Sequence, residues 1–231
     1  SDRGRVPGRM EGRILSRVIC IMGESGSGKT TSCRNLDPKT TYYIDADGKG
    51  MSWRGWRKQY SAEAKNYYRG TDIKMIQKIL TGVSGSRPEI KTIVIDTLNG
   101  VMISDEMRRI KEKGYDKWAD LVQYVWDIVD KAYSYRDDLT IVVIMHSQTE
   151  RDDNGYLFTK IKTNGKKLEK IQLETKFTTV LLAKCVDGNY IFETHANNST
   201  AKTPMGLYEA SEIPNDIVEV IHNLEEYEKG E

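Results

Sequence analysis

The chain has 231 residues, of which 38% are apolar and 30% are charged, and its formal net charge is +1. These values exclude an intrinsically disordered chain, and they exclude a basic coat over the whole surface, so that any polyanion site must be a local patch. No long Pro-, Gly- or Ser-rich linker divides the sequence. We therefore expect one globular domain over residues 14–231, after an N-terminal tail of residues 1–13.

The cysteines and the apolar runs indicate a cellular compartment. Cys20, Cys33 and Cys185 are widely spaced and lack CxxC pairing, which favours reduced buried thiols over disulfide, zinc or redox chemistry. No run approaches the roughly 20 apolar residues of a membrane span, and the polar start lacks a hydrophobic signal region. We expect a soluble cytoplasmic protein that makes no membrane contact. Met10 is a candidate natural start, in which case the residues before it come from the cloning vector.

Short β-branched runs alternate with helical patterns in the first two thirds of the chain. The candidate strands are residues 17–22, 41–45, 92–96 and 140–145, and the clearest apolar helical stripe covers residues 117–135. This alternation predicts an α/β fold in which a mainly parallel central sheet is flanked by helices. Ligands of such sheets bind at the carboxyl ends of the strands.

The pattern changes after residue 145. Residues 156–161, 178–186 and 189–194 resemble strands with no long helix between them, and Asp187-Gly188 is a tight hairpin signal. We expect an antiparallel extension of the sheet there. Pro214 and Asn215 precede apolar residues at helical spacing, which predicts a closing helix.

The strongest motif follows the first strand and fits the pattern G-x-x-x-x-G-K-[ST], at a point where we expect a strand to lead into a helix. Its glycines allow successive backbone amides to face phosphate oxygens, and the N-terminus of the helix would add positive potential. Lys29 neutralises the β- and γ-phosphates, and Thr30 supplies an oxygen to Mg²⁺. The motif thus predicts an ATP site formed by Gly23, Glu24, Ser25, Gly26, Ser27, Gly28, Lys29, Thr30 and Thr31.

A phosphate loop needs a second carboxylate to hold hydrated Mg²⁺. The apolar strand at residues 92–96 ends in Asp96, at the edge of the sheet where the loop lies. Thr30 and Asp96 are therefore the predicted metal residues. The strand at residues 41–45 brings Asp45 and Asp47 to the same edge of the sheet. Strand alternation places these two side chains on the same side, so that at least one of them can face the phosphates.

Residues 43–48 are similar to the segment after the second core strand of RecA and RadA recombinases. The resemblance covers residues 14–148 and implies a RecA-like ATPase core. In that family a catalytic glutamate stands where this chain has Asp47, so the resemblance implies Asp47 as the catalytic carboxylate. Aspartate is one methylene shorter, which would favour slow hydrolysis. A loop-capping or ribose-side role is the alternative for either acid.

The segment after the fourth strand, His146-Ser147-Gln148, resembles the motif with which RecA-like ATPases and hexameric helicases sense the γ-phosphate. Gln148 best matches the family glutamine, and His146 is the alternative. The resemblance therefore implies Lys29, Asp47, Asp96 and Gln148 as the catalytic set.

Within this superfamily the phosphate loop and residues 96–99 most resemble small phage ATPases of single-strand annealing and recombination. The resemblance implies two DNA-binding loops, and solubilising surface charge is the alternative. The candidate contacts are Lys160, Lys162, Lys166, Lys167, Arg108 and Arg109. Lys202 lies where the family places a cation that acts on the neighbouring subunit, which implies a homo-oligomeric ring or filament.

Three functions remain open. The leading one is a phage-type ATPase that binds Mg²⁺-ATP and single-stranded DNA and is stimulated by the DNA. The second is a P-loop kinase that phosphorylates a small metabolite, because the loop and Asp96 alone do not exclude it. The third is a nucleotide-gated binding module with little turnover, which Asp47 in place of glutamate would favour.

Overall fold

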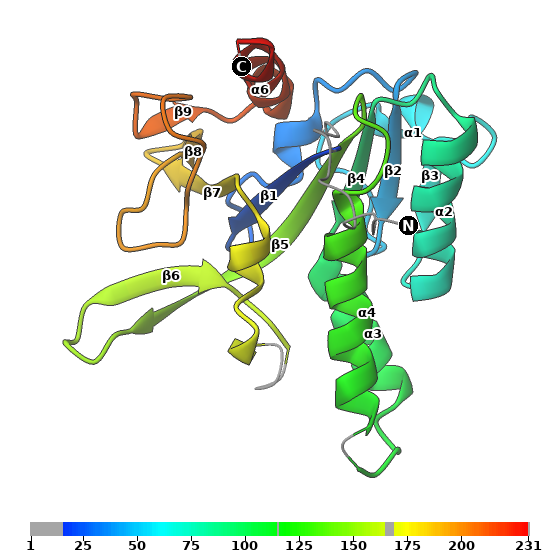
Figure 1. The fold of residues 1–231 in the computed structure, drawn as a ribbon, viewed down its shortest axis with the longest axis horizontal. Coiled ribbons are helices and arrows are strands. Elements are labelled where there is room, and N and C mark those ends of the chain that lie inside the picture. Colours follow the sequence, from blue (N-terminus) through cyan, green and yellow to red (C-terminus); the bar gives the residue numbers. More distant parts are fainter. Residues whose placement is uncertain (1–15, 115, 165–168, 231) are drawn as a thin grey trace, which may run out of the picture.

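The computed structural model describes residues 16–114, 116–164 and 169–230, so the expected tail, Lys166 and Lys167 lie outside the described residues. The strands form a sheet in the order β3-β2-β4-β5-β1-β7-β8-β9, with β6 paired to β5 (Figure 1). Neighbours are parallel from β3 to β7, whereas β8 and β9 are antiparallel. The strands are β1 Arg17–Gly23, β2 Thr41–Asp45, β3 Tyr67–Arg69, β4 Thr92–Asp96, β5 Thr140–Arg151, β6 Leu157–Ile161, β7 Val180–Val186, β8 Asn189–Glu193 and β9 Glu212–Pro214.

Helices cover both faces of the sheet (Figure 1). They are α1 Trp56–Gln59, α2 Ile73–Ser86, α3 Leu98–Arg108, α4 Asp116–Ala132 and α6 Ile217–Lys229, with 3-10 turns η1 Thr31–Cys33 and η2 Leu173–Lys176. Alternate residues of each central strand enter opposite cores: Ile93 and Ile95 face α2, α3 and α4, whereas Val94 faces α6. Because both faces are buried, these strands are continuous apolar runs. The predicted α/β class, with a mainly parallel sheet and an antiparallel C-terminal extension, is confirmed.

The structure differs from the sequence-based predictions in two elements and in the burial of one cysteine. The fourth strand continues to Arg151, because residues after His146 leave the parallel ladder and pair antiparallel with β6. The phosphate loop leads into the three-residue turn η1, where we expected a helix. Cys185 is exposed, whereas Cys20 and Cys33 are buried as expected. Asp187 and Gly188 have φ values of 50° and 80°, which confirms the tight hairpin turn. None of the described helices combines the length and apolar character needed to cross a bilayer.

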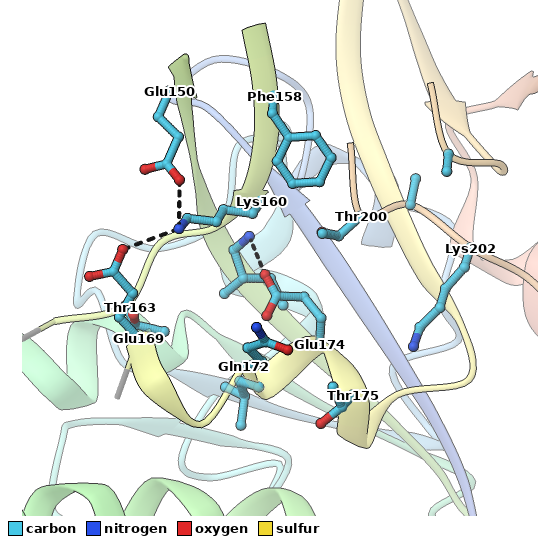
Figure 2. Close-up of a pocket in the computed structure, with 14 residues that line it drawn as sticks. Glu150, Phe158, Lys160, Thr163, Glu169, Gln172, Glu174, Thr175, Thr200 and Lys202 are labelled. Carbon is cyan, nitrogen blue, oxygen red and sulfur yellow. Dashed lines mark hydrogen bonds and ion pairs between the residues drawn. The ribbon is translucent and has the colours of Figure 1, made fainter. Parts of the chain in front are cut away.

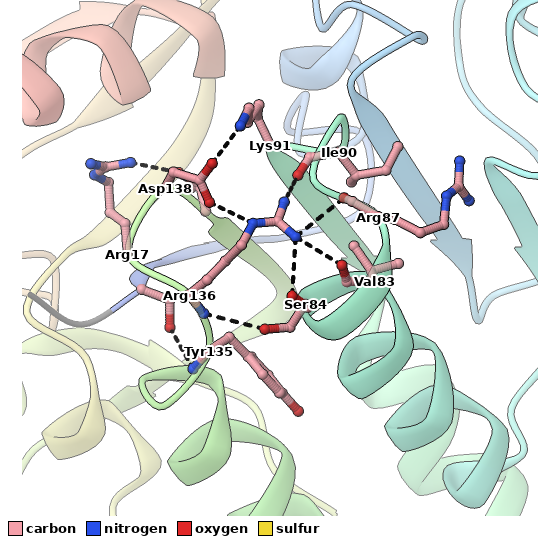
Figure 3. A network of polar contacts seen from close by, with 11 residues as sticks. Arg17, Val83, Ser84, Arg87, Ile90, Lys91, Tyr135, Arg136 and Asp138 are labelled. Atoms are coloured by element: carbon pink, nitrogen blue, oxygen red, sulfur yellow. Dashed lines mark hydrogen bonds and ion pairs between the residues drawn. The ribbon is translucent and has the colours of Figure 1, made fainter.

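The amino ends of the central strands are tied to α2 by the guanidinium of Arg136 (Figure 3). Its Nη1 donates to the carbonyls of Val83 (2.8 Å), Ser84 (3.3 Å) and Arg87 (3.2 Å), and its Nη2 donates to Ile90. A helix leaves its last carbonyls without partners, and a planar five-donor cation satisfies several of them at once. This network lies at the edge of the sheet opposite the carboxyl ends.

We expect Arg136→Ala to lower the free energy of unfolding by about 2–4 kcal/mol, because four carbonyls lose a charged donor. Arg136→Lys should lose more than half of the unfolding free energy that Arg136→Ala loses, since one ammonium cannot reproduce the planar guanidinium. Urea denaturation measures both, and Arg54→Ala, which removes an exposed guanidinium, is the matched control. Equal stability of Arg136→Ala and Arg54→Ala would contradict this role.

Candidate nucleotide-binding site

A cavity of about 410 Å³ opens at the carboxyl ends of β1, β4 and β5. Its walls are phosphate-loop residues between Ser25 and Thr31, the segment 49–52, Asp96 and Thr97, His146 and Tyr190. The parallel ladders bring these segments together, because β5 lies between β1 and β4 and its parallel pairing with both strands ends at the same edge. The predicted position of the site at the carboxyl edge therefore agrees with the cavity.

The phosphate loop has the backbone that its glycines were expected to allow. Gly28 adopts a φ of +92°, and a Cβ there would lie 2.6 Å from the Tyr190 ring. A Cβ on Gly23 would lie 2.9 Å from the carbonyl of Ala183, so a side chain would separate β1 from β7. Lys29 is 6% exposed, and its Nζ donates to the carbonyl of Glu24 at 2.5 Å, across the loop. The loop thus closes on its own lysine.

Asp96 has one oxygen held and one oxygen free. Its Oδ2 accepts hydrogen bonds from Thr30 Oγ1 (2.7 Å) and from the Tyr43 hydroxyl (2.6 Å). Its Oδ1 is buried and has no partner among the described residues. Burial raises the pKa of Asp96, against the lowering by these two donors, and burial beside Asp96 raises the pKa of Tyr43. A buried carboxylate oxygen without a donor, next to a threonine hydroxyl, fits the water shell of Mg²⁺.

The two acids after β2 have different surroundings. The oxygens of Asp45 accept from Gly48 N (2.8 Å), Gly50 N (2.8 Å) and the Tyr67 hydroxyl (2.7 Å), so this carboxylate holds the turn. Asp47 Oδ1 accepts from Thr97 Oγ1 at 2.6 Å, directly after Asp96. The structure therefore gives Asp45 the loop-capping role and brings Asp47 into contact with Thr97, which lines the cavity.

The end of β5 contributes His146, whereas we had expected Gln148. His146 lines the cavity, and its register partner on β1 is Gly23, the first residue of the phosphate loop. Gln148 lies two residues farther along the strand, opposite Lys160 of β6, and donates weakly to Glu150 at 3.5 Å. Burial and the cations of Lys29 and Lys49 lower the pKa of His146, which favours a neutral imidazole at pH 7. Gln148 is outside the site because β5 continues as a hairpin.

The family model described as "AAA domain" matches residues 16–205. The chain belongs to this family. Membership supports a nucleotide-binding domain of the ATPase type, for which Mg²⁺ is the usual companion of the nucleotide. A comparison with curated proteins gives no match.

Several residues that line the cavity of this AAA domain were not selected from the sequence, and Lys49 and Tyr190 are the two that contribute a cation and an aromatic ring. Lys49 follows Asp47 by two positions between Gly48 and Gly50, and its Nζ lies 3.3 Å from Asp47 Oδ2. Its place between two glycines was a usable signal, because such turns approach ligands closely. Tyr190 reaches the cavity only because the β7–β8 hairpin folds against Gly28, and no local pattern marks it.

Two of the described candidates for DNA contact are held closely by two carboxylates each. Lys160 lies between Glu150 (2.7 Å) and Glu169 (3.1 Å), as Figure 2 shows. Arg109 contacts Glu112 and Asp120, at 2.8 and 2.9 Å. The expected basic patch is thus weaker than the lysine count suggested, because the fold brings acids from neighbouring segments to these cations.

Lys162 and Arg108 are exposed, and they are the better candidates of the described set. Arg108 Nη2 lies 3.9 Å from Asp105 Oδ1 and donates to the Thr71 carbonyl at 3.3 Å, so it is held less closely by carboxylates than Lys160 and Arg109. Asn164 lies 3.5 Å from Glu106 of α3, so the two predicted DNA-binding regions are neighbours in space. Lys202 lines a separate cavity of about 580 Å³ beside Lys160 and Glu174 (Figure 2), away from the phosphate loop of its own chain.

The buried ammonium of Lys29 predicts a pH-dependent stability. Burial lowers its pKa from 10.5 to about 8, despite the anionic Asp96, Asp47 and Glu24, and the Lys49 cation adds to the lowering. Between these two values the unfolded chain binds more protons than the folded protein, so the wild type gains stability as pH rises. The shift corresponds to roughly 3 kcal/mol of destabilisation below pH 8.

Without nucleotide, Lys29→Met should therefore be more stable than the wild type at pH 7, and this difference should shrink between about pH 8 and 10.5. Denaturant titrations at several pH values measure the difference, and Lys58→Met, on the exposed surface, should show no such trend. A difference that stays constant with pH would contradict a charged, desolvated Lys29.

Proposed function

We propose that this AAA domain hydrolyses ATP in the presence of Mg²⁺. The observation that carries the proposal is the donor-free oxygen of Asp96, which is buried beside the Thr30 hydroxyl and within electrostatic reach of Lys29. A buried acceptor without a donor is costly, and a hydrated cation brought in by a triphosphate would relieve that cost. Phosphoryl transfer needs this combination of loop amides, lysine, hydroxyl and carboxylate.

The side chains suggest how the reaction proceeds. Lys29 exchanges the Glu24 carbonyl for the β- and γ-phosphates. Thr30 and Asp96 would hold Mg²⁺, which would supply positive charge against the phosphates. Asp47, fixed by Thr97, orients the attacking water. The water oxygen bonds to the γ-phosphorus, the bond to the bridging oxygen breaks, and the electron pair leaves with ADP. The water proton passes to Asp47 and then to phosphate.

We expect Asp96→Asn to reduce ATP hydrolysis by at least about 100-fold and to remove the effect of Mg²⁺ on ATP affinity. Phosphate release measures the rate, and titration of a fluorescent ATP analogue with and without Mg²⁺ measures the affinity. Asp72→Asn, at the N-cap of the remote helix α2, is the matched control. Mg²⁺-dependent affinity that survives in Asp96→Asn would overturn the metal role, and phosphate transferred to an added metabolite would indicate a kinase.

We further propose that single-stranded DNA binds beside α3 and the β5–β6 hairpin and stimulates hydrolysis in a phage-type recombination or annealing reaction. Lys162 and Arg108 supply exposed cations there, and the contact between Asn164 and Glu106 supports one continuous surface. Asn99 supports the coupling: its Oδ1 accepts from His146 N at 2.7 Å, and its Nδ2 donates to the Lys162 carbonyl at 2.8 Å. The cavity wall and the proposed DNA surface therefore share one buried amide.

The same proposal includes a ring or filament of identical subunits in which Lys202 acts on the cavity of a neighbour. Lys202 is fixed by backbone pairing with Val180 in both directions, so its position is well defined. A rate per subunit that rises with protein concentration in the wild type but not in Lys202→Ala would support this role. A rate independent of concentration would overturn it.

The double variant Lys162→Ala/Arg108→Ala should weaken single-stranded DNA binding and reduce the dependence of log affinity on log salt by roughly 1.4, for two lost phosphate contacts. Fluorescence anisotropy at several salt concentrations measures both quantities. Lys74→Ala/Lys78→Ala removes two exposed lysines of α2 as the control. Unchanged affinity in the first variant, with hydrolysis intact and unaffected by DNA, would contradict the DNA proposal alone.

A further inference from the structure

Lys49 lies in the nucleotide cavity although the phosphate-binding motif does not include it. It lines the cavity together with Lys29, Asp96 and His146. Its side chain is 62% exposed, and its Nζ is 3.3 Å from Oδ2 of Asp47. The lysine therefore stands at the mouth of the cavity with its charge directed at the acid proposed to orient water.

The turn that carries Lys49 is rigid on both sides of it. The Asp45 carboxylate accepts from the amides of Gly48 and Gly50, each at 2.8 Å, and the Thr31 and Ser52 hydroxyls are 2.7 Å apart. A Cβ on Gly50 would lie 2.4 Å from the Trp56 ring, so the turn is also closely packed. The lysine side chain itself is 62% exposed, and a group on a fixed backbone can be directed with little loss of entropy.

The charges around the cavity favour a second protein cation for an anionic ligand. Asp96 lines the cavity and Asp47 adjoins it, so before Mg²⁺ and nucleotide enter, Lys29 alone would leave a net negative charge, which Lys49 cancels. The phosphate loop leads into a turn of three residues, so little helix dipole adds to the positive potential. The Lys49 cation also acts on Lys29 and His146, lowering the pKa of both, which places it within electrostatic reach of the whole cavity.

We propose that Lys49 is a catalytic cation supplied by the same chain, which leaves Asp47 when ATP binds and donates to the γ-phosphate oxygens. This inference rests on the proposed hydrolysis. The exchange frees Oδ2 of Asp47 for the attacking water, while Thr97 continues to hold Oδ1. The same movement therefore stabilises the charge on the phosphate and activates the acid.

The energies favour such an exchange. The Lys49 side chain is 62% exposed, and an ion pair with a solvent-exposed lysine adds little to stability, so releasing it costs little. A donor directed at the transferred group changes kcat by about 100- to 1000-fold, because it acts on charge that moves during the reaction. In the absence of ATP the pair screens the two carboxylates from each other, and with ATP bound the lysine has a more highly charged partner.

The test compares Lys49→Ala with Lys58→Ala, which removes an exposed lysine from α1 outside the cavity. We expect Lys49→Ala to lower kcat by at least about 100-fold and to weaken a non-hydrolysable ATP analogue by about tenfold. ADP affinity should stay within about twofold of the wild type, because ADP has no γ-phosphate. Lys58→Ala should match the wild type, and Lys49→Arg should recover part of the preference for ATP over ADP.

Equal weakening of the ATP analogue and ADP in Lys49→Ala would overturn the contact with the γ-phosphate, and so would an unchanged or increased kcat. Melting temperatures without nucleotide identify a variant that fails to fold, and Lys49→Met then serves as the second replacement. A wild type that hydrolyses ATP while Lys49→Ala does so equally well overturns only the role of Lys49. A wild type that binds no ATP overturns both this inference and the proposed function.

Discussion

The backbone register between β2 and β4 determines the geometry of the nucleotide cavity. It pairs Asp45 with Asp96, so two buried carboxylates end neighbouring strands at the same level. Beyond this pair the Asp96 carbonyl accepts from the amides of Ala46 and Asp47, which brings Asp47 to Thr97. A slip of one residue would invert the faces of β2 and move both acids to the wrong side. Burial of the strands on both faces prevents such a slip.

Each carboxylate at this edge has a separate set of partners. Asp45 accepts three hydrogen bonds and holds a turn, whereas Asp96 is shared by Thr30 and Tyr43 and keeps one oxygen free. Asp47 divides its oxygens between Thr97 and Lys49. Of the six carboxylate oxygens of Asp45, Asp47 and Asp96, five have a donor or a cation beside them among the described residues, so the remaining oxygen of Asp96 is the position for a cation. The division of roles thus follows from the count of donors, although all three residues are aspartates.

The sequence predicted the elements whose signals are local. The strands at residues 41–45 and 92–96 have the predicted bounds, because each is a buried apolar run that ends in a charged residue. The helix expected after the phosphate loop is absent, and Asp37-Pro38 was a signal against it, since the residue before proline avoids helical backbone. The three-residue strands β3 and β9 are too short to show a period. The sequence alone did not indicate that His146, and not Gln148, lines the cavity, because both lie on the same face of β5 and the position where the parallel ladder ends depends on β6.

The remaining features of the candidate site depend on contacts between distant segments. The burial of Lys29, the partners of Asp45 and the place of Tyr190 each require the folded sheet. Asn99 is the clearest case. It is the second residue of α3 and is 1% exposed. Its amide oxygen accepts from the backbone N–H of His146, and its amide nitrogen donates to the carbonyl of Lys162. Since Thr97 caps that helix and also holds Asp47, any movement of Asp47 would reach the hairpin through one rigid turn. An amide with both atoms engaged has no alternative partner nearby, so displacement at either end costs a buried hydrogen bond. The fold therefore provides a short physical connection between the proposed site of hydrolysis and the proposed DNA surface.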